Sequence, residues 1–284
     1  MSTVLVTGST AGIGRETALT LARKGHRVFA TGRRQDALDK LAAEASGTKL
    51  ETVLLDVTSS ASIDAAREEV DRRTDGYGVD VLINNAGYAL IGPADSLSDD
   101  DLRKQFDTNV FGLMAVTRAF VPAMRARRSG RVINISSFAG RVTFPMMGAY
   151  HASKYALEAL SDALRNELAL FNVFVVLVEP GFVHTEFTER ALADVNRFEG
   201  GPYGGVIRTA DEVRHRFEST GVAASVIVRA IERAMHARSP AARYLAPLRM
   251  HLLLLTFRIL PTRITDVLLR FIFGIRARAL SAAC

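Results

Sequence analysis

Residues 3–14 read Thr3-Val4-Leu5-Val6-Thr7-Gly8-Ser9-Thr10-Ala11-Gly12-Ile13-Gly14. The first four are apolar or β-branched and predict a short buried strand, and a pattern of helical period follows the glycines as far as Lys24. Glycines allow a tight turn and let the backbone approach a pyrophosphate, which the amides and dipole of a helix N-terminus attract. The stretch therefore predicts a strand, a phosphate-binding loop and a helix. The plainer interpretation is a tight turn between a strand and a packed helix.

The same alternation continues along the chain. Further strands are expected at residues 27–31, 50–56, 79–83, 130–135 and 173–178. Helices are expected at residues 35–45 and 60–73, from the N-cap Ser98 to about Arg128, and around Tyr150. Strands separated by helices imply a parallel sheet covered on both faces, with ligands bound beyond the carboxyl ends of the strands. We predict an α/β fold with a single doubly wound parallel sheet of Rossmann type over residues 1–245. Residues 246–284 are predicted to form an amphipathic helical extension packed on the same domain.

Composition limits the classes of protein that fit. The chain has 284 residues, 48% of them apolar, which is enough for a sizeable core. The one cysteine, Cys284, excludes an intrachain disulfide and a paired-cysteine metal site, and we expect no metal. No basic segment followed by an apolar run precedes the strand at Thr3, so we expect no cleaved signal peptide and a cytoplasmic location.

The charge is concentrated at one end of the sequence. The chain carries a net charge of +6, and residues 240–284 hold seven arginines and one acid, Asp266, so the whole excess lies there. This charge coincides with leucine-rich segments and not with an aromatic groove. The pattern argues against a nucleic-acid partner and favours a membrane surface.

A second stretch indicates proton transfer. Ser136-Ser137 follow the strand at 130–135, and Tyr150-His151-Ala152-Ser153-Lys154 lie in a segment of helical period. Tyr150 and Lys154 are four residues apart and project from one helix face. A cation within about 4–6 Å stabilises a phenolate and lowers the pKa of tyrosine, which is ordinarily near 10. The plainer interpretation is a helix with a packed tyrosine and a solvated lysine.

Taken in order, these motifs resemble the short-chain dehydrogenase/reductase family over roughly residues 3–245. The resemblance rests on Thr7-Gly8-x-x-x-Gly12-x-Gly14, Asp56, Asn84-Asn85-Ala86-Gly87, Asn109, Ser137, Tyr150-x-x-x-Lys154 and Pro180-Gly181. The segments Tyr150 to Glu158 and Gly181 to Phe187 resemble the hydroxysteroid and retinol dehydrogenase branch.

The resemblance implies hydride transfer between a nicotinamide and a carbonyl or secondary alcohol, with four catalytic residues. Tyr150 would donate the proton, and Ser137 would hold the substrate oxygen. Lys154 would bind the nicotinamide ribose and lower the pKa of Tyr150, and Asn109 is implied to hold a water between Lys154 and solvent. Ser136 is the rival for the hydroxyl role, but the family's serine stands thirteen residues before its tyrosine, as Ser137 does.

Cofactor choice depends on the end of the second strand. Arg33 and Arg34 follow it, and no carboxylate occurs before Asp36. Arginine can pair with a ribose 2′-phosphate, whereas an acid would bind a 2′-hydroxyl, so NADP(H) is favoured and Asp36 leaves NAD(H) open. The two arginines could also be merely solvated. With the family pattern carried over, the expected cofactor contacts are Gly8, Ser9, Thr10, Gly12, Ile13, Gly14, Arg33, Arg34, Asp56, Val57, Asn85, Ala86, Gly87, Tyr150, Lys154, Pro180, Gly181, Val183 and Thr185.

Apolar residues surround the predicted site, which favours a bulky lipophilic ketone or alcohol over a sugar. They are Phe138, Val142, Phe144, Met146, Met147, Phe182, Phe187, Leu192, Phe198 and Tyr203. Residues 200–205 are rich in glycine and predict either a mobile part of a substrate lid or a plain surface turn. The alternative function is a nucleotide-sensing regulator on the same fold, whose tail binds a membrane or a partner, but a pure sensor would have no use for Tyr150.

The tail departs from the family's common glycine-rich last strand. Pro261 separates two amphipathic segments, and internal arginines leave neither with the ~20 mostly uncharged residues that a membrane span requires. The alternatives are an interfacial membrane helix pair, a lid over a greasy substrate, an oligomer contact or buried structural packing. We expect a homo-oligomer, either a dimer or a tetramer, with peripheral membrane contact through the tail as one of these alternatives.

Overall fold

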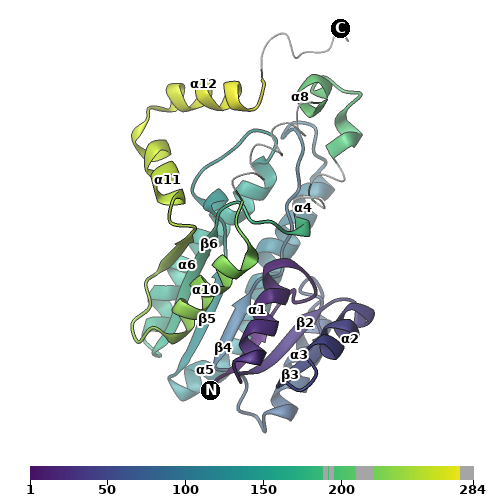
Figure 1. Ribbon diagram of the computed structural model, residues 1–284, viewed down its shortest axis with the longest axis vertical. Coiled ribbons are helices and arrows are strands. Elements are labelled where there is room, and N and C mark those ends of the chain that lie inside the picture. Colours follow the sequence, from purple (N-terminus) through teal and green to yellow (C-terminus); the bar gives the residue numbers. More distant parts are fainter. Residues whose placement is uncertain (188–190, 192–194, 209–220, 276–284) are drawn as a thin grey trace.

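The computed structural model describes residues 1–187, 191, 195–208 and 221–275, and they build a parallel β-sheet flanked by helices (Figure 1). The strand order in the described part is β3-β2-β1-β4-β5-β6-β7, and every neighbouring pair is parallel. The strands are β1 (Thr3–Val6), β2 (Arg27–Gly32), β3 (Leu50–Leu54), β4 (Val81–Asn84), β5 (Gly130–Ile135), β6 (Val173–Pro180) and β7 (Arg243–Ala246). This order confirms the predicted doubly wound sheet, whose switch point lies between β1 and β4.

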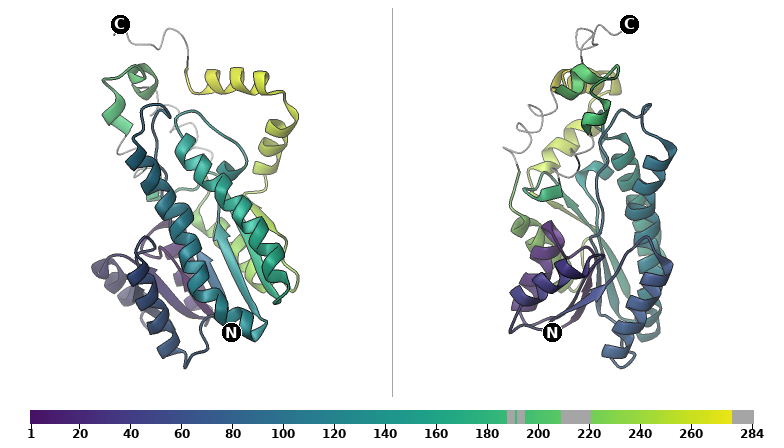
Figure 2. Two further views of the ribbon diagram at one scale, coloured as in Figure 1. Left: turned by 180° about the vertical axis from the view of Figure 1, so that it is seen from behind. Right: turned by 90° about the vertical axis from the view of Figure 1, so that its right-hand side faces the viewer.

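Helices cover both faces of the sheet (Figure 2). One apolar cluster joins the strands to α1 (Gly12–Arg23), α2 (Gln35–Glu44) and α10 (Ala224–His236). The other joins them to α3 (Ser60–Arg73), α5 (Leu113–Arg127) and α6 (Gly148–Ala169). The strands are buried on both sides because each face meets one of these clusters, which explains their nearly continuous apolar sequences.

The helix predicted after Ser98 is divided into three parts. Ser98 caps α4 (Asp99–Phe106) with a reciprocal capping box that includes Asp101. A π-helical turn, η1 (Asp107–Gly112), then leads directly into α5. Such turns insert one extra residue per turn and are frequent at functional sites. Here the π-helical turn contains Asn109.

Two strand ends differ from the prediction in a way that matters for the site. β4 includes Asn84, which pairs in register with Asn134, and β6 continues through Glu179 to Pro180 because β7 pairs with its last residues. The sheet therefore extends to the edge of the Asn85 and Gly181 motifs and fixes where their backbones begin.

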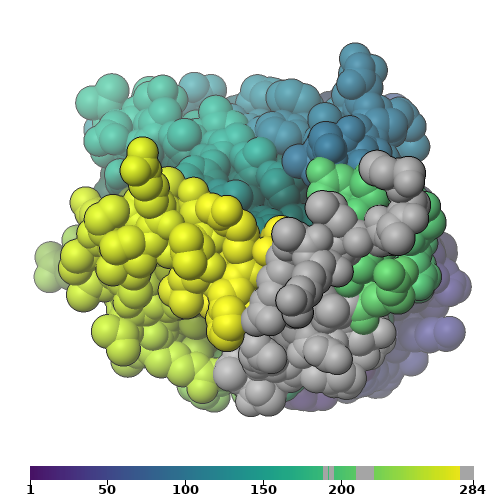
Figure 3. All heavy atoms as spheres, turned by 90° about the horizontal axis from the view of Figure 1, so that it is seen from above, coloured from purple at the N-terminus to yellow at the C-terminus, as the bar shows by residue number. Residues whose placement is uncertain are grey.

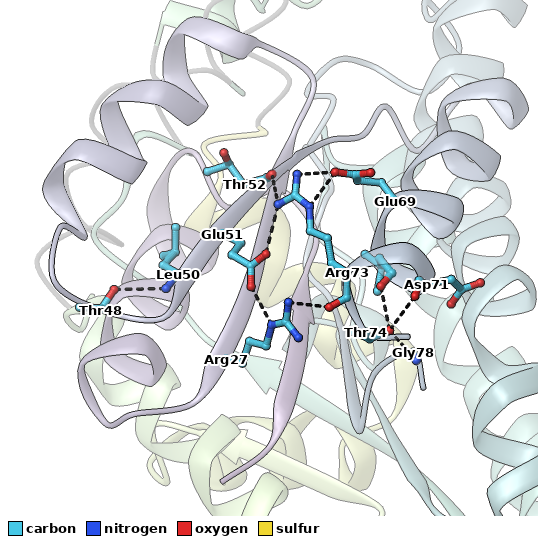
Figure 4. A network of polar contacts seen from close by, with 11 residues as sticks. Arg27, Thr48, Leu50, Glu51, Thr52, Glu69, Asp71, Arg73, Thr74 and Gly78 are labelled. Carbon is cyan, nitrogen blue, oxygen red and sulfur yellow. Dashed lines mark hydrogen bonds and ion pairs between the residues drawn. The ribbon is translucent and has the colours of Figure 1, made fainter. Parts of the chain in front are cut away.

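Figure 4 shows an ionic network that ties the outer strands to α3. Glu51 accepts hydrogen bonds from Arg27 at 2.7 Å and from Arg73 at 3.3 Å, and Arg73 pairs with Glu69 at 2.6 Å. These side chains are partly exposed, so each pair contributes only about 0–1 kcal/mol. The network lies at the start of β2, away from the carboxyl ends of the strands, and its role is structural.

After β7 the chain forms α11 (Met250–Ile259) and α12 (Thr262–Ile272), which lie at the end of the molecule toward which the strands point (Figure 1). Their inner residues pack on Phe138, Phe144 and Leu245, and this cluster includes Met250, Leu254 and Phe273. In the described part of the chain, no helix combines the length and the apolar character needed to span a bilayer. Residues 276–284, the end of the predicted extension, lie outside the described residues, as does Leu192. Smaller helices are η2 (Phe138–Gly140), η3 (Val195–Phe198) and α8 (Gly204–Arg208).

Candidate active site

The glycine loop after β1 is joined directly to the Asn85 motif after β4. The backbone amides of Asn85 and Ala86 donate to Thr7 Oγ1 at 2.9 and 3.0 Å. Asn85 Nδ2 donates in return to the carbonyls of Thr7 and Gly8 at 2.9 and 3.0 Å. Because β1 and β4 are neighbours in the sheet, hydrogen bonds join these two motifs, which are distant in sequence, at the switch point.

Two glycines explain why the loop can adopt this shape. Gly8 has a positive φ of 66°, a conformation that side chains disfavour. At Gly14 a Cβ atom would lie 2.3 Å from both Asn85 Nδ2 and the Gly8 carbonyl oxygen. The first turn of α1, which contains Gly14, therefore packs directly on the loop that precedes it.

Strands β5 and β6 and helix α6 bring the predicted catalytic residues together in a nearly dry environment. Ser137, Tyr150 and Lys154 are each less than a tenth exposed. Lys154 Nζ donates to the Ile135 carbonyl at 2.9 Å and lies 5.8 Å from the centre of the Tyr150 ring. Ser137 Oγ accepts from the Ala139 amide at 3.1 Å, which fixes the hydroxyl at the end of β5.

The pKa of Tyr150 moves in the opposite direction from the expectation. Burial raises the pKa of this phenol to about 12, and a hydrogen bond with the Ser137 side chain opposes the shift. Burial lowers the pKa of Lys154 to about 8, and the charge of Glu158 opposes that shift. The Lys154 ammonium points to a backbone carbonyl, so its charge does not offset the loss of water around the phenol.

Asn109 is held by protein groups on both sides of its amide. Its Nδ2 donates to the Tyr88 carbonyl at 2.9 Å and to Ser153 Oγ at 3.0 Å, and its Oδ1 accepts from the Tyr88 amide at 3.1 Å. Ser153 lies beside Lys154 on α6, so the π-helical turn is tied to the helix that carries the tyrosine and the lysine. The water predicted at Asn109 stays a prediction.

These groups meet at a cavity of about 800 Å³ at the carboxyl ends of the strands. The predicted residues that line it are Gly8, Thr10, Gly12, Ile13, Arg33, Asp56, Val57, Asn85, Ala86, Gly87, Ser137, Tyr150, Lys154, Pro180, Gly181, Val183 and Thr185. Ser9, Gly14, Arg34 and Asn109 do not line it. Ser9 instead donates to the Val6 carbonyl at 2.7 Å, and Arg34 is the exposed residue that precedes α2.

Ser136 also lines the cavity, so the choice between the two serines depends on their partners. Ser137 bonds to the Tyr150 side chain, whereas the Ser136 hydroxyl has no hydrogen-bond partner among the described residues. This geometry favours Ser137 for the hydroxyl role.

Apolar side chains form the part of the cavity beyond Tyr150. Six of the predicted apolar residues line it: Phe138, Phe144, Met146, Met147, Phe182 and Phe187. Val142 is instead buried in the neighbouring cluster, Phe198 lies within 3 Å of the position a Gly92 Cβ would take, and Tyr203 donates to Asp95 at 2.8 Å.

The sequence did not identify every wall of this cavity. Ile91, Val206, Ile207 and Phe273 also line it, and they come from three separate segments. The dense apolar pattern of the tail was the one signal for Phe273, but only packing of α12 against Phe144 places it at the cavity.

A dinucleotide fits the remaining half of the cavity. Helix α1 begins at Gly12, which lines the cavity, and the amides at a helix N-terminus attract a phosphate. Hydrogen bonds from Thr58 lower the pKa of the Asp56 carboxyl, and the charge of Arg33, which also lines the cavity, adds to this shift. When bound there, a nicotinamide dinucleotide would supply or accept the hydride of the reaction.

The similarity to known proteins agrees with this site. A family model described as short chain dehydrogenase matches residues 2–196. An NADPH-dependent 3-dehydrocapnine reductase from Ornithobacterium rhinotracheale is 33% identical over 270 residues, covering 94% of this chain and 95% of that protein. Retinol dehydrogenase 8 from Homo sapiens is 40% identical over 203 residues, 69% of this chain and 64% of that protein. The crystal structure of a short-chain dehydrogenase from Streptomyces avermitilis superposes with a TM-score of 0.75 at 31% identity, covering 90% of this chain and 91% of that one.

The fold and the Ser137, Tyr150 and Lys154 arrangement define a nicotinamide-dependent oxidoreductase. This chain belongs to the short-chain dehydrogenase/reductase family, and the similarity to a retinol dehydrogenase confirms the resemblance to that branch.

Proposed function

We propose that this protein interconverts a ketone and a secondary alcohol on a bulky lipophilic substrate, with NADP(H) as cofactor. The observation that carries the substrate class is the apolar half of the cavity, where Phe138, Phe144 and Phe182 form a contiguous aromatic wall with ring centres 5.0 to 5.6 Å apart. Such a wall supplies apolar contact and few hydrogen bonds, which suits a steroid-like, retinoid-like or long-chain ketone and not a sugar.

The buried residues divide the proton chemistry between them. The Ser137 hydroxyl holds the substrate oxygen beside the Tyr150 phenol. Tyr150, with a pKa of about 12, keeps its proton at neutral pH and donates it as negative charge develops on that oxygen in the reducing direction. Lys154, which donates to the Ile135 carbonyl, would also hold the ribose hydroxyls of the cofactor, and its positive charge would stabilise the phenolate that forms as Tyr150 gives up its proton.

The preference for NADP(H) is supported by the rim of the cavity at β2. Arg33 lines the cavity there, whereas the nearest following carboxylate, Asp36, is exposed on the first turn of α2 and does not line it. A guanidinium at this position pairs with a 2′-phosphate. The relative whose name specifies NADPH supports the same choice.

The extension is part of the same unit in this proposal. Residues 1–245 form the dinucleotide-binding and catalytic domain, and residues 246–284 follow as an extension whose described part contains α11 and α12. The inner residues of α11 and α12 support this assignment, because they pack in one cluster with Phe138, Phe144 and Leu245 of the domain, and Phe273 lines the substrate cavity.

The test is a screen of NADPH oxidation by the full chain with matched ketones. Steroid, retinoid and long-chain ketones are compared with a small water-soluble ketone and a keto sugar, each with NADPH and with NADH. We expect kcat/KM for the bulky apolar ketones to exceed that for the keto sugar by about tenfold or more, because each apolar group buried in such a pocket discriminates by about that factor. Equal or better turnover of the sugar would overturn the substrate class, and the Tyr150→Phe variant serves as the inactive control.

A further inference from the structure

The outer faces of α11 and α12 are apolar although they face solvent. The exposed side chains of the first segment are Leu248, Leu252, Leu255 and Ile259, and those of the second are Ile264, Val267, Leu268 and Phe271. In the first set the spacing is three or four residues, and in the second Val267 and Leu268 are adjacent and each lies three or four residues from Ile264 and Phe271. Each set therefore forms one stripe on a helical surface. Half of the large exposed apolar side chains of the described chain therefore gather on these two consecutive helices and on the turn that leads into α11.

These stripes lie opposite the faces that hold the helices on the domain. On α11 the inward residues are Met250, Leu254 and Phe257, and Phe257 lies 6.0 Å from the Phe144 ring. On α12 the inward residues are Leu269 and Ile272, and Phe273, which follows the helix, lies 5.5 Å from Phe144. Packing on the domain therefore explains why the inner faces are apolar. It does not explain the exposed apolar stripes, and exposed apolar patches of this kind mark interaction surfaces.

Arginines border the stripes. Successive helical residues are about 100° apart, so on α11 Arg249 and Arg258 project about a quarter turn to either side of the stripe. On α12, Arg263 and Arg270 both project from one border of its stripe. Neither Arg258 nor Arg263 forms an ion pair within the described part of the chain, and Arg270 bonds only to the Asp266 carbonyl at 3.3 Å. Asp266 is the one acid on these two helices.

We infer that the outer faces of α11 and α12 lie on the surface of an anionic lipid bilayer. The leucine, isoleucine and valine stripes enter the boundary of the acyl chains, and the bordering arginines reach the phosphate headgroups. A second copy of the chain is the weaker occupant, because a symmetric contact would bring the arginines of both copies together with only one acid, Asp266, from each copy to pair with them. Figure 3, the view from above, shows these helices in yellow spread over this end of the molecule.

The bilayer surface also bears on how a substrate enters the cavity, a step that rests on the proposed function. The inner side of the same helices forms a wall of the substrate cavity through Phe273, so the bilayer and the cavity lie on opposite sides of one helical layer. A lipophilic substrate dissolved in the bilayer then reaches the cavity without crossing much water.

The experiment is sedimentation of the full chain with vesicles, without cofactor or substrate. We compare phosphatidylcholine vesicles with vesicles of phosphatidylcholine and phosphatidylglycerol. Leu252→Glu is compared with Leu170→Glu, because Leu252 and Leu170 are 71% and 72% exposed and Leu170 lies at the end of α6, away from the stripes. The double variant Arg263→Gln, Arg270→Gln is compared with Arg23→Gln, Arg103→Gln, in which the arginines are exposed on other helices.

We expect the wild-type chain to sediment with the anionic vesicles only. Leu252→Glu should weaken this binding about tenfold or more, and Leu170→Glu should leave it unchanged. The Arg263 and Arg270 variant should also weaken it, and binding should fall with added salt as the Debye length shortens from about 10 Å at 0.1 M to about 3 Å at 1 M.

Three results would overturn the inference: no sedimentation of the wild-type chain, equal loss in the Leu252 and Leu170 variants, or conversion of an oligomer to a monomer by Leu252→Glu without any vesicle binding. The last result assigns the stripes to a contact between copies. Turnover of a water-soluble ketone by Leu252→Glu is measured separately, so a failure of vesicle binding and a failure of the proposed reaction give different results.

Discussion

The rings of Phe144 and Phe273 lie 5.5 Å apart and join the loop that precedes Tyr150 to the end of α12. Phe144 also contacts Phe138, Phe257 and His151 of α6, so it connects the segment after β5, the active-site helix and the tail. The shape of the substrate cavity therefore depends on residues at both ends of the catalytic half of the sequence.

The first prediction concerns this contact. Phe273→Ala should raise KM for a bulky ketone roughly tenfold and leave KM for a small ketone nearly unchanged, because only the large substrate reaches the α12 wall. Val267→Ala, on the exposed stripe of α12, is the matched control and should change neither value. Steady-state kinetics with both ketones measure the effect, and an equal rise for the two ketones would show that Phe273 supports the whole site and not the substrate wall.

Tyr150→Phe should lower kcat by about a hundredfold to ten-thousandfold, since it removes the proton donor and keeps the ring. The dissociation constant of NADPH should stay close to that of the wild-type chain, because the phenol oxygen makes a minor part of the cofactor site. Turnover assays and fluorescence titration with NADPH separate the two effects. Comparable turnover in this variant would remove Tyr150 from the proposed chemistry.

The affinity for NADPH should depend on pH through Lys154. The pKa of this lysine is lowered by burial to about 8, so its ammonium is lost as the pH rises through about 8 and not near 10.5. Only the charged form donates all its hydrogen bonds to the ribose, so NADPH binding should weaken above about pH 8. Fluorescence titration across this range measures it, and Lys154→Arg, which stays charged, should lose the dependence. A flat wild-type profile would show that Lys154 does not titrate there.

Replacement of Arg33 and replacement of Arg34 should differ in their effect on NADPH binding, although the two residues are neighbours. Arg33 lines the cavity and Arg34 does not, so Arg33→Gln should weaken NADPH binding tenfold or more, since a hydrogen bond to a charged group contributes about 1.5–3 kcal/mol. Binding of NADH should change little in either variant, because it has no 2′-phosphate. Arg34→Gln is the control for the loss of one positive charge. If both variants weaken both cofactors equally, these arginines act only through general charge.

Gly14→Ala should lower the free energy of unfolding by about 1–3 kcal/mol, because its Cβ atom would overlap Asn85 Nδ2 and the Gly8 carbonyl. At Gly200 the space around an added Cβ is open, so Gly200→Ala should change stability by a few tenths of a kcal/mol at most. Chemical denaturation measures both. Equal stability of the two variants would show that the loop after β1 can move away from α1.

The sequence by itself determined the sheet and the composition of the site. Apolar strands that alternate with helices predict a parallel sheet, and such a sheet brings the ends of β1, β4, β5 and β6 to one edge whatever the details of packing. The spacing of Tyr150 and Lys154 on one helix and the glycines after β1 are also local features, so they can be recognised in the sequence. Local patterns therefore predicted which residues meet.

Only the tertiary structure decided how those residues are placed. The π-helical turn at Asn109, the separation of Arg33 from Arg34 and the direction of the Lys154 ammonium toward Ile135 each depend on neighbours distant in sequence. The pKa of Tyr150 rises because burial outweighs a charge that points elsewhere, and no residue spacing reports burial. The two faces of α11 and α12 are both apolar, so the sequence could not tell which face packs on Phe144 and which faces outward. Packing against the aromatic cluster around Phe144 determines which face is buried.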